Sequence, residues 1–158
     1  MNENTILANL RTALVGNSAL NAWSTTNYSQ LPWFYIGMDP DDPPPAGHYP
    51  LVALFPDSRL TGNVRDDEET GVMLMVGVSD TTRTVDAVNS HLITYAGVTR
   101  CVELRRLVLA AVKAADLDGG MITSGEAEYE TLLEFPLFII MQLLTIRRPY
   151  EFRDERLV

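Results

Sequence analysis

The segment 135–146 constrains the fold of this chain most, because it is apolar on both sides of any strand that it could form. In an extended strand, successive side chains point to opposite faces. One face would carry Phe138, Ile140, Gln142, Leu144 and Ile146, and the other Leu137, Ile139, Met141, Leu143 and Thr145. A half-exposed strand alternates apolar with polar residues, and this one barely does. Its second face must therefore be covered, either by another layer of the same chain or by another subunit.

A membrane explains this segment less well. The run is far shorter than the roughly 20 apolar residues that a spanning helix needs. It also contains Gln142 and is followed by Arg147 and Arg148. We therefore expect a packed strand and no membrane partner.

Composition indicates one globular domain over residues 1–158 and argues against a surface that grips nucleic acid. The chain has 12 basic and 21 acidic residues, a net charge of -9, whereas binding to the nucleic acid backbone needs clustered Lys and Arg. An acidic surface would instead help a protein to avoid adhering to DNA. Cys101 is the only cysteine, which excludes an intrachain disulfide, and its place in a predicted helix favours a buried thiol. The first residues lack the basic start and apolar stretch of a signal peptide, so we expect folding in a cytoplasm.

Helical periodicity is clear in two places. Ile6, Leu7, Leu10 and Leu14 predict an N-terminal helix, and Ser18 can cap a short helical turn after it. The second stripe runs at i, i+3, i+4, i+7, i+8 and i+11 through Leu104, Leu107, Val108, Ala111, Val112 and Ala115.

The remaining segments predict strands and loops. Strands are expected over 32–38, 49–55, 71–78 and 135–146. The Pro/Asp-rich segment 39–47 predicts a stiff exposed loop, 57–70 a charged flap or long hairpin, and 149–158 a polar tail. Residues 80–98 fit either a helix or, at 91–95, a short strand. Glu126, Glu128 and Glu130 alternate with less polar residues, which favours a strand, with a helix capped by Ser124 as the alternative.

These elements predict the α+β class: a mostly antiparallel sheet of four to five strands, with two helices packed on one face. Two helices on one face leave the other face of the 135–146 strand without a cover. Obligate subunit interfaces resemble a domain core cut in half, so oligomerisation is the economical explanation.

Candidate catalytic and metal-binding residues give only weak signals. Asp39, Asp41 and Asp42 carry carboxylate oxygens that could bind Mg²⁺ or Ca²⁺, but the neighbouring prolines disfavour the wrapped loop that a calcium site needs. His48 and His91 lie in no zinc-binding or Ser-His-Asp spacing. The carboxylates of Glu126, Glu128 and Glu130 are more typical of a solvated or pore-lining face than of an acid–base pair. We therefore expect no catalytic residue, no metal and no cofactor.

The order of elements resembles the tail terminator, or tail-completion, proteins of long-tailed bacteriophages. The likeness runs from the N-terminal helix through the strands 49–55 and 71–78, the helix 102–112 and the closing strand 135–146. It rests on element order and hydrophobic pattern, because no single motif carries it. The loop 39–47 and the segment 80–98 have no counterpart in the resemblance.

The resemblance implies a structural protein of the virion tail or neck, assembled in the host cytoplasm. Such a protein forms a six-membered ring that caps the tail tube, contacts tail-tube and possibly sheath subunits, and docks the head–tail connector. It is no enzyme, and DNA passes through its lumen without specific binding. The expected subunit interface comprises Leu137, Ile139, Met141, Leu143 and Arg147. The expected lumen or rim comprises Asp66, Asp67, Glu68, Glu69, Glu126, Glu128 and Glu130.

Three alternatives stay open at this point. The chain could be another neck or baseplate adaptor, or a small ligand-binding or regulatory α+β domain. An enzyme that uses residues 39–42 together with His48 is the remaining alternative.

Overall fold

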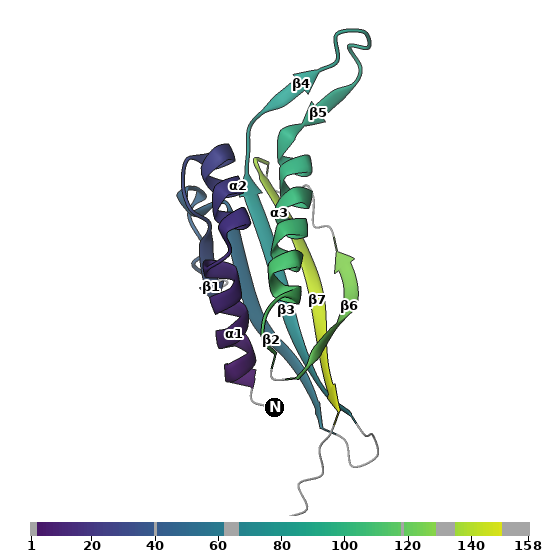
Figure 1. Ribbon diagram of the computed structural model, residues 1–158. Helices are drawn as coiled ribbons and strands as arrows, with labels where there is room; N and C mark the ends of the chain where they lie inside the picture. The colour runs from purple at the N-terminus through teal and green to yellow at the C-terminus, as the bar shows by residue number, and fades with distance from the viewer. Residues whose placement is uncertain (1–2, 40, 62–66, 118, 129–134, 150–158) are drawn as a thin grey trace, which may run out of the picture.

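The computed structural model describes residues 3–39, 41–61, 67–117, 119–128 and 135–149. Figure 1 shows a long, twisted sheet with helices on one side of it and a narrow hairpin projecting from one end. The elements in chain order are α1 (Glu3–Val15), α2 (Ser18–Tyr28), β1 (Trp33–Ile36), the short 3-10 helix η1 (Ala46–His48), β2 (Leu51–Thr61), β3 (Asp67–Ser79), β4 (Arg83–Val85), β5 (Ile93–Tyr95), α3 (Ala96–Lys113), β6 (Met121–Glu128) and β7 (Leu137–Pro149).

The main sheet has five strands in the order β1-β2-β3-β7-β6, which confirms the α+β class. Strand β1 runs parallel to β2, and the other neighbouring strands are antiparallel, so the sheet is mixed. The parallel pair arises because the chain does not turn directly from β1 into β2. Residues 37–50 instead carry it back along the sheet edge before β2 begins, as parallel pairing requires.

Three α-helices lie on one face of the sheet in the described chain, one more than the sequence pattern predicts (Figure 1). Helix α2 has 11 residues where only a short turn was expected. Asn17, and not Ser18, caps it, because the Asn17 side chain accepts the backbone N–H of Leu20 at 2.9 Å. Leu20 and Trp23 then lie one turn apart and are both buried, which anchors this helix to the core.

The main hydrophobic core lies between the helices and the sheet. Leu10 of α1 and Leu104 of α3 pack there with Leu74 of β3 and Leu144 of β7. Cys101 of α3 belongs to this core, which confirms the buried thiol, and burial raises its pKa to about 12. At this pKa the thiol stays protonated near neutral pH and is a poor nucleophile.

Residues 80–95 form a β-hairpin and not a helix, and this resolves the most ambiguous part of the sequence. Strands β4 and β5 pair antiparallel, separate from the main sheet, and project beyond its end (Figure 1). Helix α3 begins directly after β5, at Ala96. We call residues 83–95 the arm.

Asp80 fixes the base of the arm to the body. Its side chain accepts the backbone N–H of Thr82 at 2.8 Å and forms an ion pair with Arg100 of α3. Its backbone N–H donates to the carbonyl of Pro136 at 2.9 Å, next to β7. The point where the arm leaves the sheet is therefore tied to two other segments of the chain, α3 and the residue before β7.

The predicted flap over 57–70 and the segment that contains Glu126 and Glu128 both form strands of the sheet where the structure describes them. Strands β2 and β3 continue into the predicted flap and pair as far as Thr61 and Glu68, while residues 62–66 lie outside the description. Strand β6 runs to Glu128, so the helical alternative for this segment is wrong. The register of β6 against β7 shifts between Ser124 and Ala127.

Candidate functional site

The face of the sheet opposite the helices is apolar, and we call it the open face. Cross-strand partners share a face, so the strand register defines its members. Its apolar residues are Leu51, Ala53 and Phe55 of β2, Met73 and Met75 of β3, and Leu137, Ile139, Met141 and Leu143 of β7. Leu137, Ile139, Met141 and Leu143 are the residues that the sequence predicts at a subunit interface, and all four are half-buried.

Part of the open face is covered by the chain itself. A second cluster of buried residues, separate from the main core, contains Tyr49, Leu51, Ala53 and Met75. The Tyr49 ring lies directly on Gly77, where an added Cβ would approach the ring to 2.9 Å. The segment between β1 and β2 therefore covers the β2–β3 side of this face. Within the described chain, no α-helix covers the β7 side (Figure 1).

An ion pair lies at one end of the open face. Arg147 of β7 is the register partner of Glu69 of β3, and its Nε donates to the Glu69 carboxylate at 2.9 Å. The pair is partly exposed, so its contribution to the stability of the isolated chain is small. Arg147 was predicted at the subunit interface and Glu69 at the lumen or rim, and the structure joins them on one surface.

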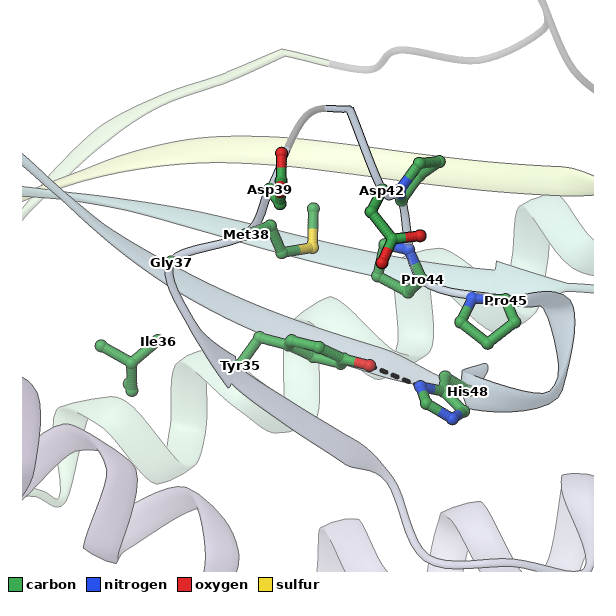
Figure 2. A pocket seen from close by; sticks show the side chains of 10 residues that line it. Tyr35, Ile36, Gly37, Met38, Asp39, Asp42, Pro44, Pro45 and His48 are labelled. Atoms are coloured by element: carbon green, nitrogen blue, oxygen red, sulfur yellow. Dashed lines mark hydrogen bonds between the residues drawn. The ribbon is translucent and has the colours of Figure 1, made fainter.

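A pocket of about 540 Å³ lies at the β1 edge of the sheet (Figure 2). Tyr35 and His48 line one side of it, and Asp39, Asp42 and the prolines 43–45 line the other. The structure thus brings His48 and two of the three loop aspartates together. His91 is exposed on the arm and takes no part in this pocket.

The His48 ring is held on two sides. Its Nδ1 is hydrogen-bonded to the Tyr35 hydroxyl, and its ring stacks on Trp33 with centroids 3.6 Å apart and planes 8° from parallel. Asp39 accepts the backbone N–H of Asp41 at 2.9 Å and makes no hydrogen bond to His48. The arrangement therefore differs from a Ser-His-Asp triad, in which a carboxylate orients the imidazole.

The predicted lumen or rim residues that the structure describes come from β3 and β6, two strands that β7 separates in the sheet. Glu68, one of the residues predicted at the lumen or rim, is buried in the single chain, with only 6% of its surface exposed. By strand alternation it lies on the same side of β3 as the core residues Val72 and Leu74. Asp67 begins β3, and Glu126 and Glu128 lie in β6. Asp66 and Glu130 lie outside the described residues.

Two features of functional interest, the apolar residues of the arm and Trp33, were not identified from the sequence. The arm carries exposed apolar side chains at Val85, Val88, Leu92 and Ile93. An alternation of apolar and polar residues over 83–85 and 93–95 was the available signal, but each run is too short to be distinctive. Trp33, against the His48 ring, was visible only as part of an aromatic strand.

The described part of the chain shows neither a cluster of metal ligands nor a membrane-spanning helix. No group of three or more His, Cys, Asp or Glu residues is placed there to hold a metal ion. None of the described helices combines the length and the apolar character needed to cross a membrane.

The fold and these surfaces place the protein in the α+β class, as a two-layer structure with an apolar sheet face opposite its helices. The sequence matches no protein-family model and no curated protein.

Proposed function

We propose that this chain is a structural assembly protein of a phage or phage-like particle. Its role is that of a tail terminator, which closes the tail tube as an oligomeric ring of its own copies and joins it to the head–tail connector. Tail-tube subunits, and sheath subunits where a sheath is present, are its other partners, and the assembled protein resides in the tail or neck of the virion. On this proposal it needs no active site, metal or cofactor.

The apolar open face is the observation that carries this proposal. Leu137, Ile139, Met141 and Leu143 form a row along β7 on the side of the sheet that no described helix covers. Contiguous apolar surface of this kind marks protein–protein contacts more often than bare solvent-facing surface. Contact with another copy would bury this row, and the resulting interface would resemble the core of an obligate oligomer.

The charge of the chain suits a ring through which DNA passes. With a net charge of -9, the protein repels the phosphate backbone at long range. Asp67, Glu69, Glu126 and Glu128, together with residues 66 and 130, are candidates for the lumen or rim. Glu68 is not among them because its side chain is buried.

Measurement of the molar mass in solution, with electron microscopy of the same sample, tests the proposal directly. We expect rings or ring precursors from the purified chain, and capped tube ends when tail-tube subunits are added. A protein that stays monomeric at high concentration and also fails to bind tube subunits would contradict it.

A matched pair of variants connects assembly to the open face. Leu143→Lys places a charge on the face, whereas Glu103→Lys places the same side chain at an exposed position on α3. We expect the first variant to lose assembly and the second to keep it, with both folded by circular dichroism. Equal assembly of the two variants would remove the open face from the proposal.

The pocket at Tyr35, Asp39, Asp42 and His48 favours the alternative of a small ligand-binding domain. Its aromatic side and its carboxylates suit a ligand with a flat or cationic group. A ligand that raises the melting temperature of the wild-type protein but not of His48→Ala would support this alternative. Loss of an enzymatic activity on substitution of His48 or Asp42 would support an enzyme.

A further inference from the structure

One side of the arm carries apolar residues and a single arginine, and the other side carries threonines; we call the first the apolar side. The register pairs Arg83 with Tyr95 and Val85 with Ile93, so these four residues share one side, while Thr84 and Thr94 lie on the other. Val85 and Ile93 are 50% and 44% exposed, and Val88 at the tip is 98% exposed. Single exposed apolar residues are ordinary, but several on one projecting hairpin indicate a contact surface.

The tip of the arm is ordered by local hydrogen bonds and not by packing. The Asp86 carboxylate accepts the backbone N–H of Val88 at 2.8 Å and that of Asn89 at 2.7 Å, and the Leu92 carbonyl accepts the N–H of Asp86 at 2.9 Å. A two-stranded hairpin on its own is only marginally stable in water. A shaped tip on an otherwise unsupported hairpin is therefore suited to docking against another surface.

The apolar side of the arm continues into the open face. Tyr95, at the base of the arm, contacts Phe135 with ring centroids 5.7 Å apart. Tyr95 and Phe135 line a small groove together with Leu137 and Phe138, and Leu137 is the first residue of the open-face row on β7. The base of the arm and the first residue of the open-face row thus line the same groove.

The arm carries a positive charge, whereas the loop at the β1 edge of the open face carries negative charges. Arg83 lies on the apolar side of the arm and makes no ion pair with a described residue. Asp86, the other charged residue within the arm, is engaged by the two N–H groups of the tip. The edge of the open face carries Asp39, Asp41 and Asp42 on the loop after β1, and the row along β7 is uncharged up to Arg147.

We infer that the arm of one copy packs on the open face of a second copy of this chain, with Val85 and Ile93 against the apolar row and Arg83 facing the acidic loop. This inference rests on the proposed function, because it names how the subunits of the ring hold one another. A ring needs two different complementary surfaces on each subunit, and the arm and the open face are such a pair. The same contact covers the apolar sheet and supports the hairpin.

The first test compares two double variants of the arm by sedimentation of the full-length protein. Val85→Asp with Ile93→Asp places charges on the apolar side, and Thr84→Asp with Thr94→Asp places the same charges on the polar side. We expect the first to weaken self-association by at least about 100-fold and the second by less than about 5-fold. Both should keep the wild-type melting temperature, because all four side chains are exposed.

The second test mixes the arm variant Val85→Asp/Ile93→Asp with the face variant Leu143→Lys. Neither should assemble alone, but each retains the surface that the other lacks, so the mixture should form a one-to-one complex. Assembly of the arm variant by itself, or the absence of a complex in the mixture, would overturn the inference.

The two proposals fail in different ways. If the wild type and the arm variant, measured separately, assemble equally well, the docking of the arm is overturned and the ring function is unaffected. Wild-type protein that does not assemble, alone or with tube subunits, overturns the ring function and the arm contact with it.

Discussion

The ring of Phe138 occupies the space that a Cβ on Gly97 would need, so helix α3 approaches strand β7 more closely than any other residue at this position would allow. Gly97 lies in the first turn of α3, directly after the arm, and Phe138 lies at the start of β7. The contact therefore sets how the helix, the arm and the apolar strand are placed together.

Gly97→Ala should destabilise the protein even though Ala is the better helix former by about 1 kcal/mol. The added methyl group would overlap an aromatic ring in the core, and overpacking of this kind costs about 1–3 kcal/mol. Urea unfolding at neutral pH measures the change. Gly47→Ala is the control, because no atom lies within 4 Å of its added Cβ, and it should change the free energy of unfolding by less than about 0.5 kcal/mol. A stable Gly97→Ala protein would show that α3 and β7 are not in this contact.

Asp80→Asn should remove a pH-dependent contribution to stability. Burial opposes ionisation of Asp80, but hydrogen bonds from Thr82 and the Arg100 guanidinium outweigh it, so its pKa lies below the ordinary value of 3.8. The unfolded chain has the higher pKa, so the contribution is complete well above pH 3.8 and is lost as the pH falls through the folded pKa. The variant should lose about 1–3 kcal/mol at neutral pH.

The stability difference between Asp80→Asn and the wild type should shrink as the pH falls from about 5 to about 2. Urea unfolding over this range measures it. Asp57→Asn is the control, because Asp57 is exposed. A difference for Asp80→Asn that does not vary with pH would contradict the role of its charge.

Cys101 should react with a thiol reagent only when the protein unfolds. Its side chain is 2% exposed, and burial raises its pKa to about 12, so neither access nor thiolate is available in the native state. The labelling rate at about pH 8 should rise by at least about 100-fold in denaturant. A cysteine introduced at the exposed Val85 of the arm should label rapidly without denaturant. Equal rates at the two positions would contradict the packing of α3 on the sheet.

Arg147→Ala should separate stability from assembly. Its ion pair with Glu69 is partly exposed, so the loss in the isolated chain should be below about 1 kcal/mol. If the end of the open face is part of a subunit contact, the same change should weaken self-association by about 10-fold. Arg106→Ala, an exposed arginine on α3, should affect neither quantity. Identical assembly of both variants would place Arg147 outside the interface.

The sequence predicted the elements whose periodicity is long. The stripe through Leu104, Val108 and Val112 gave α3, and the double apolar pattern of 135–146 gave β7. The short elements were harder, because three-residue strands such as β4 and β5 contain too few side chains to show a period. Helix α2 was underestimated for a similar reason, since its polar residues conceal the buried pair Leu20 and Trp23.

Some features of the candidate surfaces could be predicted from a local sequence pattern, and others could not. That Leu137, Ile139, Met141 and Leu143 share one face follows from alternation along a single strand, and the register confirms it. That Tyr35 meets His48, or that Glu69 meets Arg147 across 78 positions of sequence, does not follow from any local pattern. Such pairs depend on which strands become neighbours.

The sequence by itself therefore determined the α+β class, the buried single cysteine and the two-sided apolar strand, because periodicity and composition act within a segment. Only the tertiary structure decided that β1 runs parallel to β2, that residues 83–95 project as an arm, and that one face of the sheet lies opposite all three described α-helices. These features depend on which segments pair across the chain, and that choice is made by packing of the whole core.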